Sequence, residues 1–595
     1  MTTETLRPIY DVARDAGLDP GDVIPWGRHK AKISLDALAR REGAPQGRLV
    51  LVSAINPTPA GEGKTTTSVA LAMGLAKRGR RAIAALREPS LGPVFGVKGG
   101  GTGGGNATLV PAADINLHFT GDIHAITSGT TRSSRRWSTT RSTSATRSTS
   151  TRRNVRWRRA MDMNDRALRN VVVNLGKGNG PAREGAFDIT AASEIMAILC
   201  LAAGPKDLEA RLARVVVGTT STGKPVTAGD LGAASAMAAL LVDALMPNLV
   251  QTREGTPAIV HGGPFGNIAH GCNSILATRM ALAYGEDVVT EAGFGFDLGA
   301  EKFLDIKCRV AGLWPRMVVL VATHRALKMH GGVSVAKAGD PNVDALRKGL
   351  DHLSRHLETL RSYGLPTVVA VNAFPNDTAD EAAALREYGI GNGVTVARCD
   401  GFARGGDGSV ELADAVLDTL AKTDADPPKA RFMYELSDAP EEKIRKVARG
   451  VYGADGVEFT PAARKDLEAV VKLGGGELPV CMAKTHLSLT DDPTKPGRPR
   501  GFTITVREVR LSAGAGYIVP LTGEIMTMPG LPKEPAARRV VVHPDGRITG
   551  LMQGEERRPG VRARPTKTRT PAVTGGWLLA FRVSPVGAHA PVLVT

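Results

Sequence analysis

PTPAGEGKTTT, residues 57–67, lies between an apolar run at 48–55 and a helix-like pattern at 68–79. A strand, a glycine-rich loop that ends in Lys-Thr and a helix form the context of a phosphate-binding loop. Gly61 and Gly63 let backbone N–H groups turn toward phosphate oxygens, because no Cβ stands in the way. The stretch therefore predicts a nucleotide site. The alternative is a glycine-rich turn without a ligand.

The residues of this loop have separate expected roles. Lys64 is expected to reach the β and γ oxygens of the nucleotide, and Thr65 to offer its hydroxyl to Mg²⁺. The N-terminus of the following helix adds partial positive charge beside the phosphates. Thr58 stands where the usual pattern begins with glycine. The predicted nucleotide-binding residues are Thr58, Pro59, Ala60, Gly61, Glu62, Gly63, Lys64 and Thr65.

Strand-like and helix-like runs alternate along most of the chain. Continuous apolar runs between amphipathic helices are typical of a mostly parallel sheet with helices on both faces, which binds ligands at the C-terminal ends of its strands. The predicted fold class is therefore α/β and P-loop NTPase-like. After about residue 430 the pattern is less regular and richer in β signals, which predicts smaller C-terminal α/β domains. The strand-like runs lie at 48–55, 81–86, 169–176, 214–220, 316–323 and 365–374, and helical runs at 233–245 and 342–364.

Composition fits a large cytoplasmic enzyme. The 595 residues are enough for several domains, and the five cysteines lie far apart, without the spacing of a zinc site or a disulfide framework. The N-terminal residues lack the basic and apolar layout of a signal peptide, and no apolar run is long enough to span a bilayer. We therefore expect a cytoplasmic protein with no membrane partner.

The net charge of +17 does not indicate a nucleic-acid partner, because most of it lies in two segments. Residues 129–152 hold six arginines and no acid, and residues 553–595 hold seven basic residues against two glutamates, so these segments account for 11 of the 17 charges. Nucleic-acid surfaces combine basic residues with aromatic or groove-reading elements. The segment 129–152 has one aromatic residue, Trp137, and no periodicity. We predict no nucleic-acid partner.

The segment 129–152 also differs in composition from its neighbours. Of its 24 residues, 21 are Ser, Thr or Arg. Read two bases later with GC-favouring codons, it gives HNPLFAAVVDNPLYQRNALDIDP, which has apolar residues at helical spacing. We interpret the segment as the product of two compensating changes of reading frame, and the alternative is a solvated low-complexity loop. As written, it is expected to be flexible and solvated.

Five further stretches follow the phosphate loop in a fixed order. Together with it they resemble the formate–tetrahydrofolate ligase family, also called 10-formyltetrahydrofolate synthetase, in its single-function bacterial form. The resemblance runs from about residue 20 to residue 552, and residues 553–595 read as an extension without recognisable chemistry, expected to be disordered. The stretches are LREPSLGPVFGVKGGGTGGG (86–105), HGGPFGNIAHGCNS (261–274), TEAGFGFDLGAEKF (290–303), VATHRALKMHGG (321–332) and VNAFPNDTADE (371–381).

The resemblance implies ATP-dependent ligation of formate to tetrahydrofolate, which gives 10-formyltetrahydrofolate, ADP and phosphate. Formate is a poor acyl donor, so ATP first converts it to formyl phosphate, and N10 of the folate then attacks the formyl carbon. Phosphoryl transfer needs charge neutralisation and alignment, for which Lys64 and Arg87 are the catalytic candidates. The planar fork of Arg87 can hold the intermediate. The alternative for Arg87 is a structural ion pair with Glu88 or another acid.

Folate needs a flat, mostly apolar slot with a few polar groups. By resemblance the folate-binding candidates are Glu88, Phe294 and Phe402, although either phenylalanine can instead belong to the core. Phe402 stands where the family usually has Trp, so its stacking area is smaller. His324 replaces an aliphatic residue of the family.

The resemblance also implies a homotetramer whose small-molecule substrates are formate, ATP with Mg²⁺ and tetrahydrofolate, with dependence on a monovalent cation left open. Two other functions stay open: a P-loop synthetase that activates a different carboxylate, and a non-catalytic folate- or RNA-binding protein. We expect a nucleotide-binding and catalytic domain at 1–360, an α/β domain that contributes to the folate site at 361–455, a smaller domain at 456–552 and the extension at 553–595.

We predict that the protein as written is less stable and less active than a variant with the alternative reading frame restored across 129–152. A run of Ser, Thr and Arg cannot bury an apolar stripe, and six closely spaced arginines resist desolvation. Thermal midpoints and formate-dependent turnover of the two proteins provide the measurement. Equal midpoints and equal turnover would leave an unusual but tolerated loop.

Overall fold

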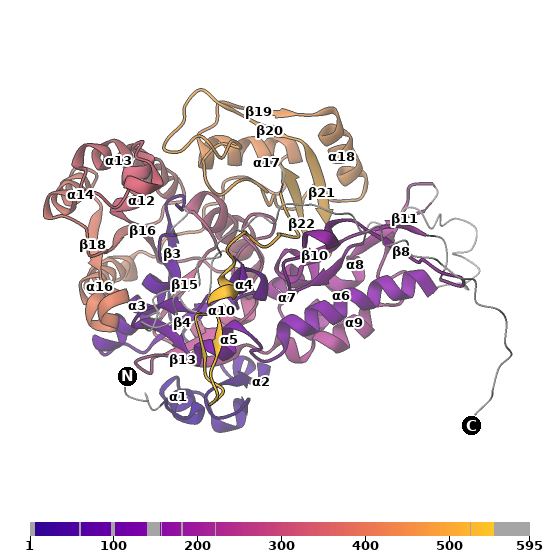
Figure 1. The fold of residues 1–595 in the computed structure, drawn as a ribbon, viewed down its shortest axis with the longest axis horizontal. Coiled ribbons are helices and arrows are strands. Elements are labelled where there is room, and N and C mark those ends of the chain that lie inside the picture. The colour runs from indigo at the N-terminus through magenta and orange to yellow at the C-terminus, as the bar shows by residue number, and fades with distance from the viewer. Residues whose placement is uncertain are drawn as a thin grey trace, which may run out of the picture. The chain divides into compact units, whose positions relative to one another are not determined.

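The apolar runs of the sequence form the centre of a twelve-stranded sheet in the computed structural model (Figure 1). Seven strands pair in parallel, in the order β14, β4, β15, β3, β16, β17 and β18. In that order they span Pro257–Val260, Ala82–Leu86, Asp287–Glu291, Arg48–Ala54, Met317–Ala322, Thr367–Asn372 and Thr395–Cys399. The structure describes residues 6–58, 61–96, 101–139, 155, 157–179, 182–220, 222–523 and 525–551.

Antiparallel strands extend this sheet beyond β14. Strand β13 (Asn248–Thr252) pairs with β14 on one side and with β2 (Ala31–Ile33) and β6 (Ala107–Val110) on the other. The outer strands β1 (Val23–Pro25) and β5 (Gly103–Gly104) pair with β2 and β6. Strand β5 belongs to the glycine-rich stretch 86–105, which is therefore anchored to the edge of the sheet.

Helices cover both faces of the parallel strands. In β3, Val50 and Val52 pack with α3 and α16, whereas Leu49 and Leu51 point to a core shared with α10, α12 and α13. This alternation follows from the two-residue period of a strand, and burial on both faces explains why these strands are continuous apolar runs. The predicted fold class is confirmed. The helices span Lys64–Lys77, Val410–Ala425, Ile275–Tyr284, His324–His330 and Val343–Ser362.

Two apolar runs that we expected in the parallel sheet lie outside it. The run 169–176 contributes β8 (Val171–Val173), which pairs only with the short strand β9 (Arg183–Gly185), and Val172 is 59% exposed. The run 214–220 contributes β11 (Val216–Thr219), which forms a hairpin with β12 (Pro225–Thr227). The prediction of sheet membership is wrong for both runs, because a local apolar pattern indicates a strand without naming its partner.

Helix α6 (Asp122–Thr139) includes the first part of the Ser/Thr/Arg segment. The backbone oxygen of Thr130 accepts a 2.9 Å hydrogen bond from Nε1 of Trp157. The alternative of a loop is therefore wrong at 129–139, where the backbone is helical, and the expectation of a flexible and solvated segment stays a prediction. A helix begun by the upstream residues continues here because extending a helix is far easier than nucleating one. Residues 140–152 lie outside the described residues.

The part of the chain after residue 430 has an apolar core of its own. Helices α17 (Pro440–Val447) and α18 (Pro461–Lys472) share this core with the short strands β19 to β22. All the described residues belong to one compact unit, Met1–Glu555, and the domain boundaries at 360 and 455 stay predictions. The second unit, Glu556–Thr595, lies outside the described residues. The four strands span Gly456–Phe459, Thr503–Val506, Glu508–Ser512 and Tyr517–Leu521.

The five cysteines are all free and buried. Burial raises the pKa of Cys399 and of Cys481 to about 11, which keeps these thiols protonated at neutral pH. The expectation of reduced thiols is met. Within the described part of the chain, no helix is long and apolar enough to cross a membrane.

Candidate active site

The phosphate loop joins the C-terminal end of β3 to the first turn of α3. Gly61 and Gly63 adopt positive φ values of 77° and 72°, which residues with a Cβ rarely adopt. A Cβ on Gly63 would also lie 2.3 Å from Nδ2 of Asn372. Both glycines are therefore required by the shape of the loop. Pro59 and Ala60, which we predicted to bind ATP, lie outside the described residues.

Glu62 fastens the loop from within. Its side chain is buried, and Oε1 accepts the backbone N–H of Thr58 at 2.8 Å. Oε2 accepts the hydroxyl of Thr323, the residue after β16, at 2.6 Å. The backbone oxygen of Glu62 accepts Nδ2 of Asn372, the last residue of β17, at 3.1 Å. The carboxylate that we predicted as part of the nucleotide site thus ties the loop to the ends of two neighbouring strands.

Glu291 connects two of the predicted site residues. One of its carboxylate oxygens accepts the hydroxyl of Thr65 at 2.9 Å, and the other lies 3.6 Å from Nη2 of Arg87. Strand order explains this meeting, because Arg87 follows β4, the phosphate loop follows β3 and Glu291 ends the strand between them. Lys64 is half buried and precedes Thr65 in the first turn of α3. Lys64, Thr65 and Arg87 therefore lie at one edge of the sheet.

Arg87 has an acidic partner, and that partner is Glu291 rather than Glu88. The ion pair is loose, and Nε of Arg87 is buried without a hydrogen-bond partner. A guanidinium with an unused buried N–H group keeps capacity for a carboxylate or phosphate. Gly293 leaves room for it, since a Cβ there would lie 2.8 Å from Nη1 of Arg87. The ion pair and a ligand-binding role are therefore compatible.

Glu88 lies in a buried and acidic setting. Burial, together with the carboxylates of Asp122 and Asp162, raises its pKa well above the ordinary value, and Lys32 opposes this only in part. The ammonium of Lys32 is already paired with Asp122 at 2.7 Å. One carboxyl oxygen of Glu88 has no hydrogen-bond partner. Burial therefore favours the protonated form of Glu88, which can donate as well as accept a hydrogen bond.

The two predicted folate phenylalanines have different surroundings. Phe294 follows β15, adopts a positive φ of 56° and packs on His486 with ring centroids 4.5 Å apart and ring planes tilted by 31°. Phe402 lies on the short helix Gly401–Arg404 after β18 and is 44% exposed. A Cβ on Gly104 would lie 3.1 Å from its ring, so the glycine run makes room for it. Neither ring belongs to a described apolar core, which disfavours the core interpretation.

Residues that hold the site together were not singled out from the sequence. Glu291, Thr323 and Asn372 lie within stretches quoted above, and each ends or directly follows a buried parallel strand. Polar residues at that position are the available signal, because parallel strands deliver them to one edge of the sheet. His486 lies far along the chain and carries no comparable signal.

The family model for formate–tetrahydrofolate ligase matches residues 1–552. The chain belongs to the formate–tetrahydrofolate ligase family. The resemblance seen in the motifs is confirmed, and it begins at residue 1 rather than at about residue 20. The formate–tetrahydrofolate ligase of Myxococcus xanthus (strain DK1622) is 67% identical over 552 residues, which cover 93% of this chain and 100% of that protein. That of Paracoccus denitrificans (strain Pd 1222) is 55% identical over 552 residues, or 92% of this chain and 98% of that protein.

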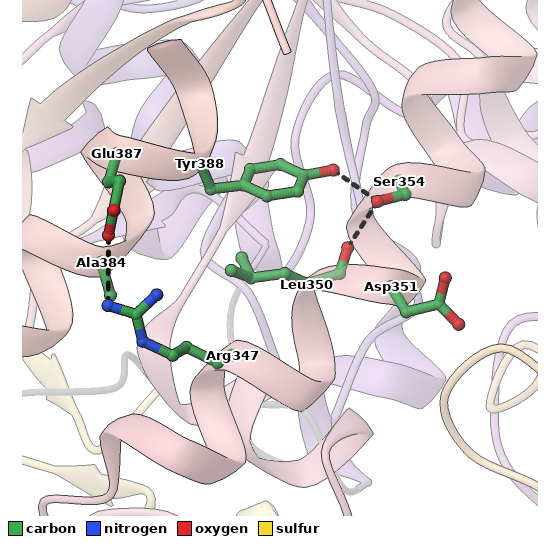
Figure 2. A pocket seen from close by; sticks show the side chains of 7 residues that line it. All are labelled: Arg347, Leu350, Asp351, Ser354, Ala384, Glu387 and Tyr388. Atoms are coloured by element: carbon green, nitrogen blue, oxygen red, sulfur yellow. Dashed lines mark hydrogen bonds and ion pairs between the residues drawn. The ribbon is translucent and has the colours of Figure 1, made fainter. Parts of the chain in front are cut away.

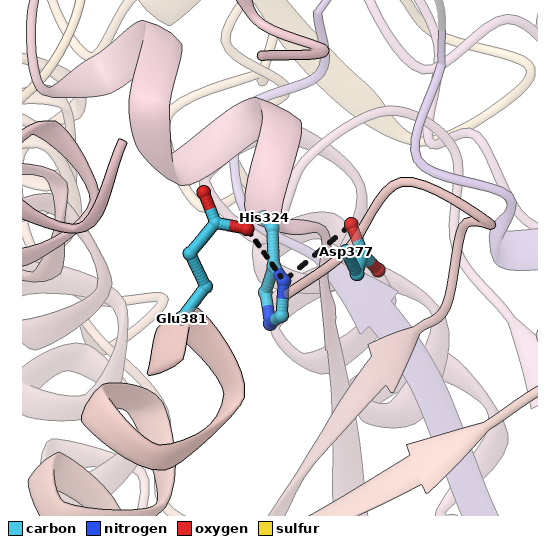
Figure 3. A group of neighbouring side chains, drawn as sticks. All are labelled: His324, Asp377 and Glu381. Carbon is cyan, nitrogen blue, oxygen red and sulfur yellow. Dashed lines mark ion pairs between the residues drawn. The ribbon is translucent and has the colours of Figure 1, made fainter. Parts of the chain in front are cut away.

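One group of described side chains has the spacing of metal ligands (Figure 3). Nδ1 of His324 lies 3.4 Å from Asp377 and 3.6 Å from Glu381. The ammonium of Lys328, 2.9 Å from Glu381, already balances one of the two carboxylates. The other ring nitrogen of His324 has no hydrogen-bond partner, whereas a metal-ligating histidine normally donates its second N–H. These features do not fit a metal centre, and we interpret the group as a buried charge cluster.

A surface groove of about 410 Å³ lies between α13 and α14 (Ala379–Gly391) (Figure 2). The hydroxyls of Ser354 and Tyr388 hydrogen bond at 2.6 Å across it, and Arg347 pairs with Glu387. None of the residues that line this groove is one of the predicted site residues of the ligase family. The groove therefore lies on the side of α13 toward α14, apart from the phosphate-loop contacts described above.

We expect Glu88→Gln to gain thermal stability over the unchanged protein as pH rises from about 5 to about 8. Because the pKa of Glu88 is raised in the folded state, its contribution to stability is present at low pH and is lost as pH rises toward the folded pKa. Glutamine has nearly the same shape as glutamate, but its side chain does not gain or lose a proton in this pH range. Thermal midpoints at the two pH values provide the measurement, with Glu387→Gln, an acid that is 72% exposed, as the control. A midpoint difference that does not change with pH would contradict a raised pKa of Glu88.

Proposed function

We propose that this chain joins formate to tetrahydrofolate with hydrolysis of ATP to ADP and phosphate, and forms 10-formyltetrahydrofolate. The observation that carries this proposal is the meeting of the phosphate loop, Arg87 and Glu291 at one edge of the sheet, in a chain of this ligase family. An acyl phosphate intermediate needs positive charge around its phosphate, and Lys64 of the loop and Arg87 at the end of β4 supply two cations.

The reaction proceeds in two transfers. A formate oxygen attacks the γ-phosphorus of ATP, and the bond between this phosphorus and the β,γ-bridging oxygen breaks. ADP departs, and formyl phosphate remains. N10 of tetrahydrofolate then attacks the formyl carbon, and the bond from that carbon to the phosphate oxygen breaks. Phosphate departs, and N10 loses its proton to phosphate or water.

Lys64 and the N-terminus of α3 neutralise charge on the transferring phosphoryl group. The hydroxyl of Thr65 and the carboxylate of Glu291, 2.9 Å apart, offer the hard oxygen ligands that suit Mg²⁺. Mg²⁺ held by these oxygens would supply additional positive charge beside the phosphates. Glu62 keeps the loop in shape for this task through Thr323 and Thr58.

Arg87 holds the carboxylate of formate and then the phosphate of the intermediate. Its pairing with Glu291 at 3.6 Å is loose enough for the guanidinium to turn to an anionic ligand. A fork that binds carboxylate and phosphate equally well can remain engaged through both transfers. The charge of Arg87 therefore counts most in the transition states, where negative charge is redistributed.

Glu88, Phe294 and Phe402 bind tetrahydrofolate. Burial favours the protonated form of Glu88, and a protonated carboxyl suits the uncharged donor and acceptor edge of a pterin. The exposed ring of Phe402 and the ring of Phe294, which packs on His486, offer flat apolar faces. We also propose, from the habit of the family, a cytoplasmic homotetramer with the domain division given above; dependence on a monovalent cation is a matter for assay.

Lys64→Ala is expected to lower formyl transfer on the order of hundreds-fold, because it removes a preorganised cation from a preformed loop. Release of ADP that requires both formate and tetrahydrofolate provides the measurement. Lys472→Ala, at the exposed end of α18, is the matched control. Near-normal turnover in folded Lys64→Ala would show that the loop does not hold the reacting phosphates. Unchanged protein that turns over ATP without either co-substrate would contradict the ligase function itself.

Arg87→Ala is expected to act mainly on kcat, and Phe402→Ala mainly on the KM for tetrahydrofolate. Arg87 matters most while formyl phosphate forms and collapses, whereas loss of one stacking ring costs roughly 1–3 kcal/mol of binding. Steady-state kinetics with each substrate varied in turn separate the two effects. If both substitutions changed only the affinity for ATP, the assignment of these two subsites would be wrong.

A further inference from the structure

Three histidines, of which His352 and His356 are buried and His330 is partly buried, lie behind the phosphate loop. His330 ends α12, and His352 and His356 occupy successive turns of α13. The rings of His330 and His352 stack with centroids 3.8 Å apart, and those of His352 and His356 cross at 87°. Burial lowers the pKa of all three, that of His356 to about 4. All three rings are therefore neutral at neutral pH, and each has one donor and one acceptor nitrogen.

The hydrogen bonds fix which nitrogen of each ring carries the proton. His330 accepts the backbone N–H of Gly497 at Nδ1, 3.0 Å away, so its Nε2 donates to the backbone oxygen of Asn56 at 3.0 Å. His352 donates from Nδ1 to the backbone oxygen of Gly497 at 2.8 Å, so its Nε2 accepts. His356 must then donate from Nε2, which lies 3.2 Å from Nε2 of His352 and 3.2 Å from Oδ1 of Asn56. One set of tautomers satisfies every contact.

Asn56 is the residue on which these bonds converge. It is fully buried between β3 and Pro57, the first residue of the phosphate-loop stretch. Its Nδ2 donates to Asp297 at 3.1 Å and to the backbone oxygen of His486 at 3.3 Å. His486 packs on Phe294. Asn56 therefore touches the root of the phosphate loop on one side and the support of the proposed folate ring pair on the other.

We propose that His330, His352 and His356 are positioning residues that hold Asn56 in place. Through Asn56 they fix the distance between the phosphate loop and the Phe294–His486 pair. The inference rests on the proposed function, which requires a formyl group on the phosphate side to meet a folate nitrogen. Both substrates can bind to subsites that have shifted slightly, but the transfer between them depends on near-attack geometry. A misplacement of about 1 Å can cost roughly a hundredfold in rate.

Substitution of His356 tests the donor at the centre of this arrangement. His356→Leu removes the N–H that reaches Asn56 and His352, whereas His356→Gln keeps an N–H donor at the end of a side chain of similar reach. We expect His356→Leu to lower kcat for 10-formyltetrahydrofolate formation about tenfold or more, with affinities for ATP and for tetrahydrofolate kept within about threefold. We expect His356→Gln to recover most of the loss.

Three further measurements separate positioning from a structural role. Equilibrium titration with ATP measures the concentration of protein that binds ATP. Dividing the rate by this concentration gives kcat per ATP-binding site, so that unfolded protein does not lower the value. Thermal midpoints report stability. Ser354→Ala, on the side of the same helix that bonds Tyr388 of α14 (Figure 2), is the control and should shift stability without changing kcat per site. If His356→Leu fails to fold, His352→Asn keeps a donor for Gly497 but offers no acceptor to His356, and the same selective loss is expected.

The proposal is overturned if kcat per site stays within about twofold in the variants, or if His356→Gln is no better than His356→Leu. It is also overturned if the affinity for ATP or tetrahydrofolate falls as much as kcat, because the histidines would then shape one subsite only. Absence of formate- and tetrahydrofolate-dependent turnover in the unchanged protein would contradict the proposed function instead, so the two failures are distinguishable.

Discussion

The parallel order of the central strands is the constraint on which the site depends. Because β4, β15, β3, β16 and β17 all end at one edge, the polar residues at their ends meet around a single loop. The loop cannot hold its own shape, since its glycines offer no side chains. Glu62 within the loop supplies that shape together with its partners Thr323 and Asn372 at the ends of neighbouring strands, although Asn372 stands 310 residues further along the chain. A local motif thus works only within the completed sheet.

Buried charge is the second feature that organises the site. A buried ion pair is costly unless its geometry is good, and the pair of Arg87 with Glu291 is long at 3.6 Å. The pair of Lys32 with Asp122 is close at 2.7 Å and is supported by Asn248. The close pair suits a fixed scaffold, whereas the loose pair leaves a cation ready for an anionic ligand. The contrast supports assigning the chemistry to Arg87 rather than to Lys32.

The sequence was most informative where residue type and position alone impose a structure. The glycines of the phosphate loop and the doubly buried strands could be predicted, because positive φ values and burial on both faces demand those residues. Which distant segments pair with one another could not be predicted from the sequence. No local sequence feature distinguishes β8, which lies outside the sheet, from β17 within it. Likewise, no residue near Asn56 in the sequence indicates that His352 and His356 lie beside it. The histidines lie in an ordinary amphipathic helix, where a buried polar residue reads as an interruption of the apolar stripe.

The two ends of helix α6 differ in what surrounds them. Its first residue, Asp122, is fixed by Lys32 and Asn248 close to the proposed site. Further along, Ile123 and Ile126 belong to an apolar core that includes Leu241 of α9 (Ala234–Leu241), and α6 and α9 lie side by side (Figure 1). Beyond Thr130 the sequence supplies Ser, Arg and Thr in place of further apolar residues. The start of the helix is therefore held by two hydrogen bonds to Asp122, beside Glu88, and by the apolar contacts of Ile123 and Ile126, whereas the sequence beyond Thr130 offers few apolar side chains that could extend this core.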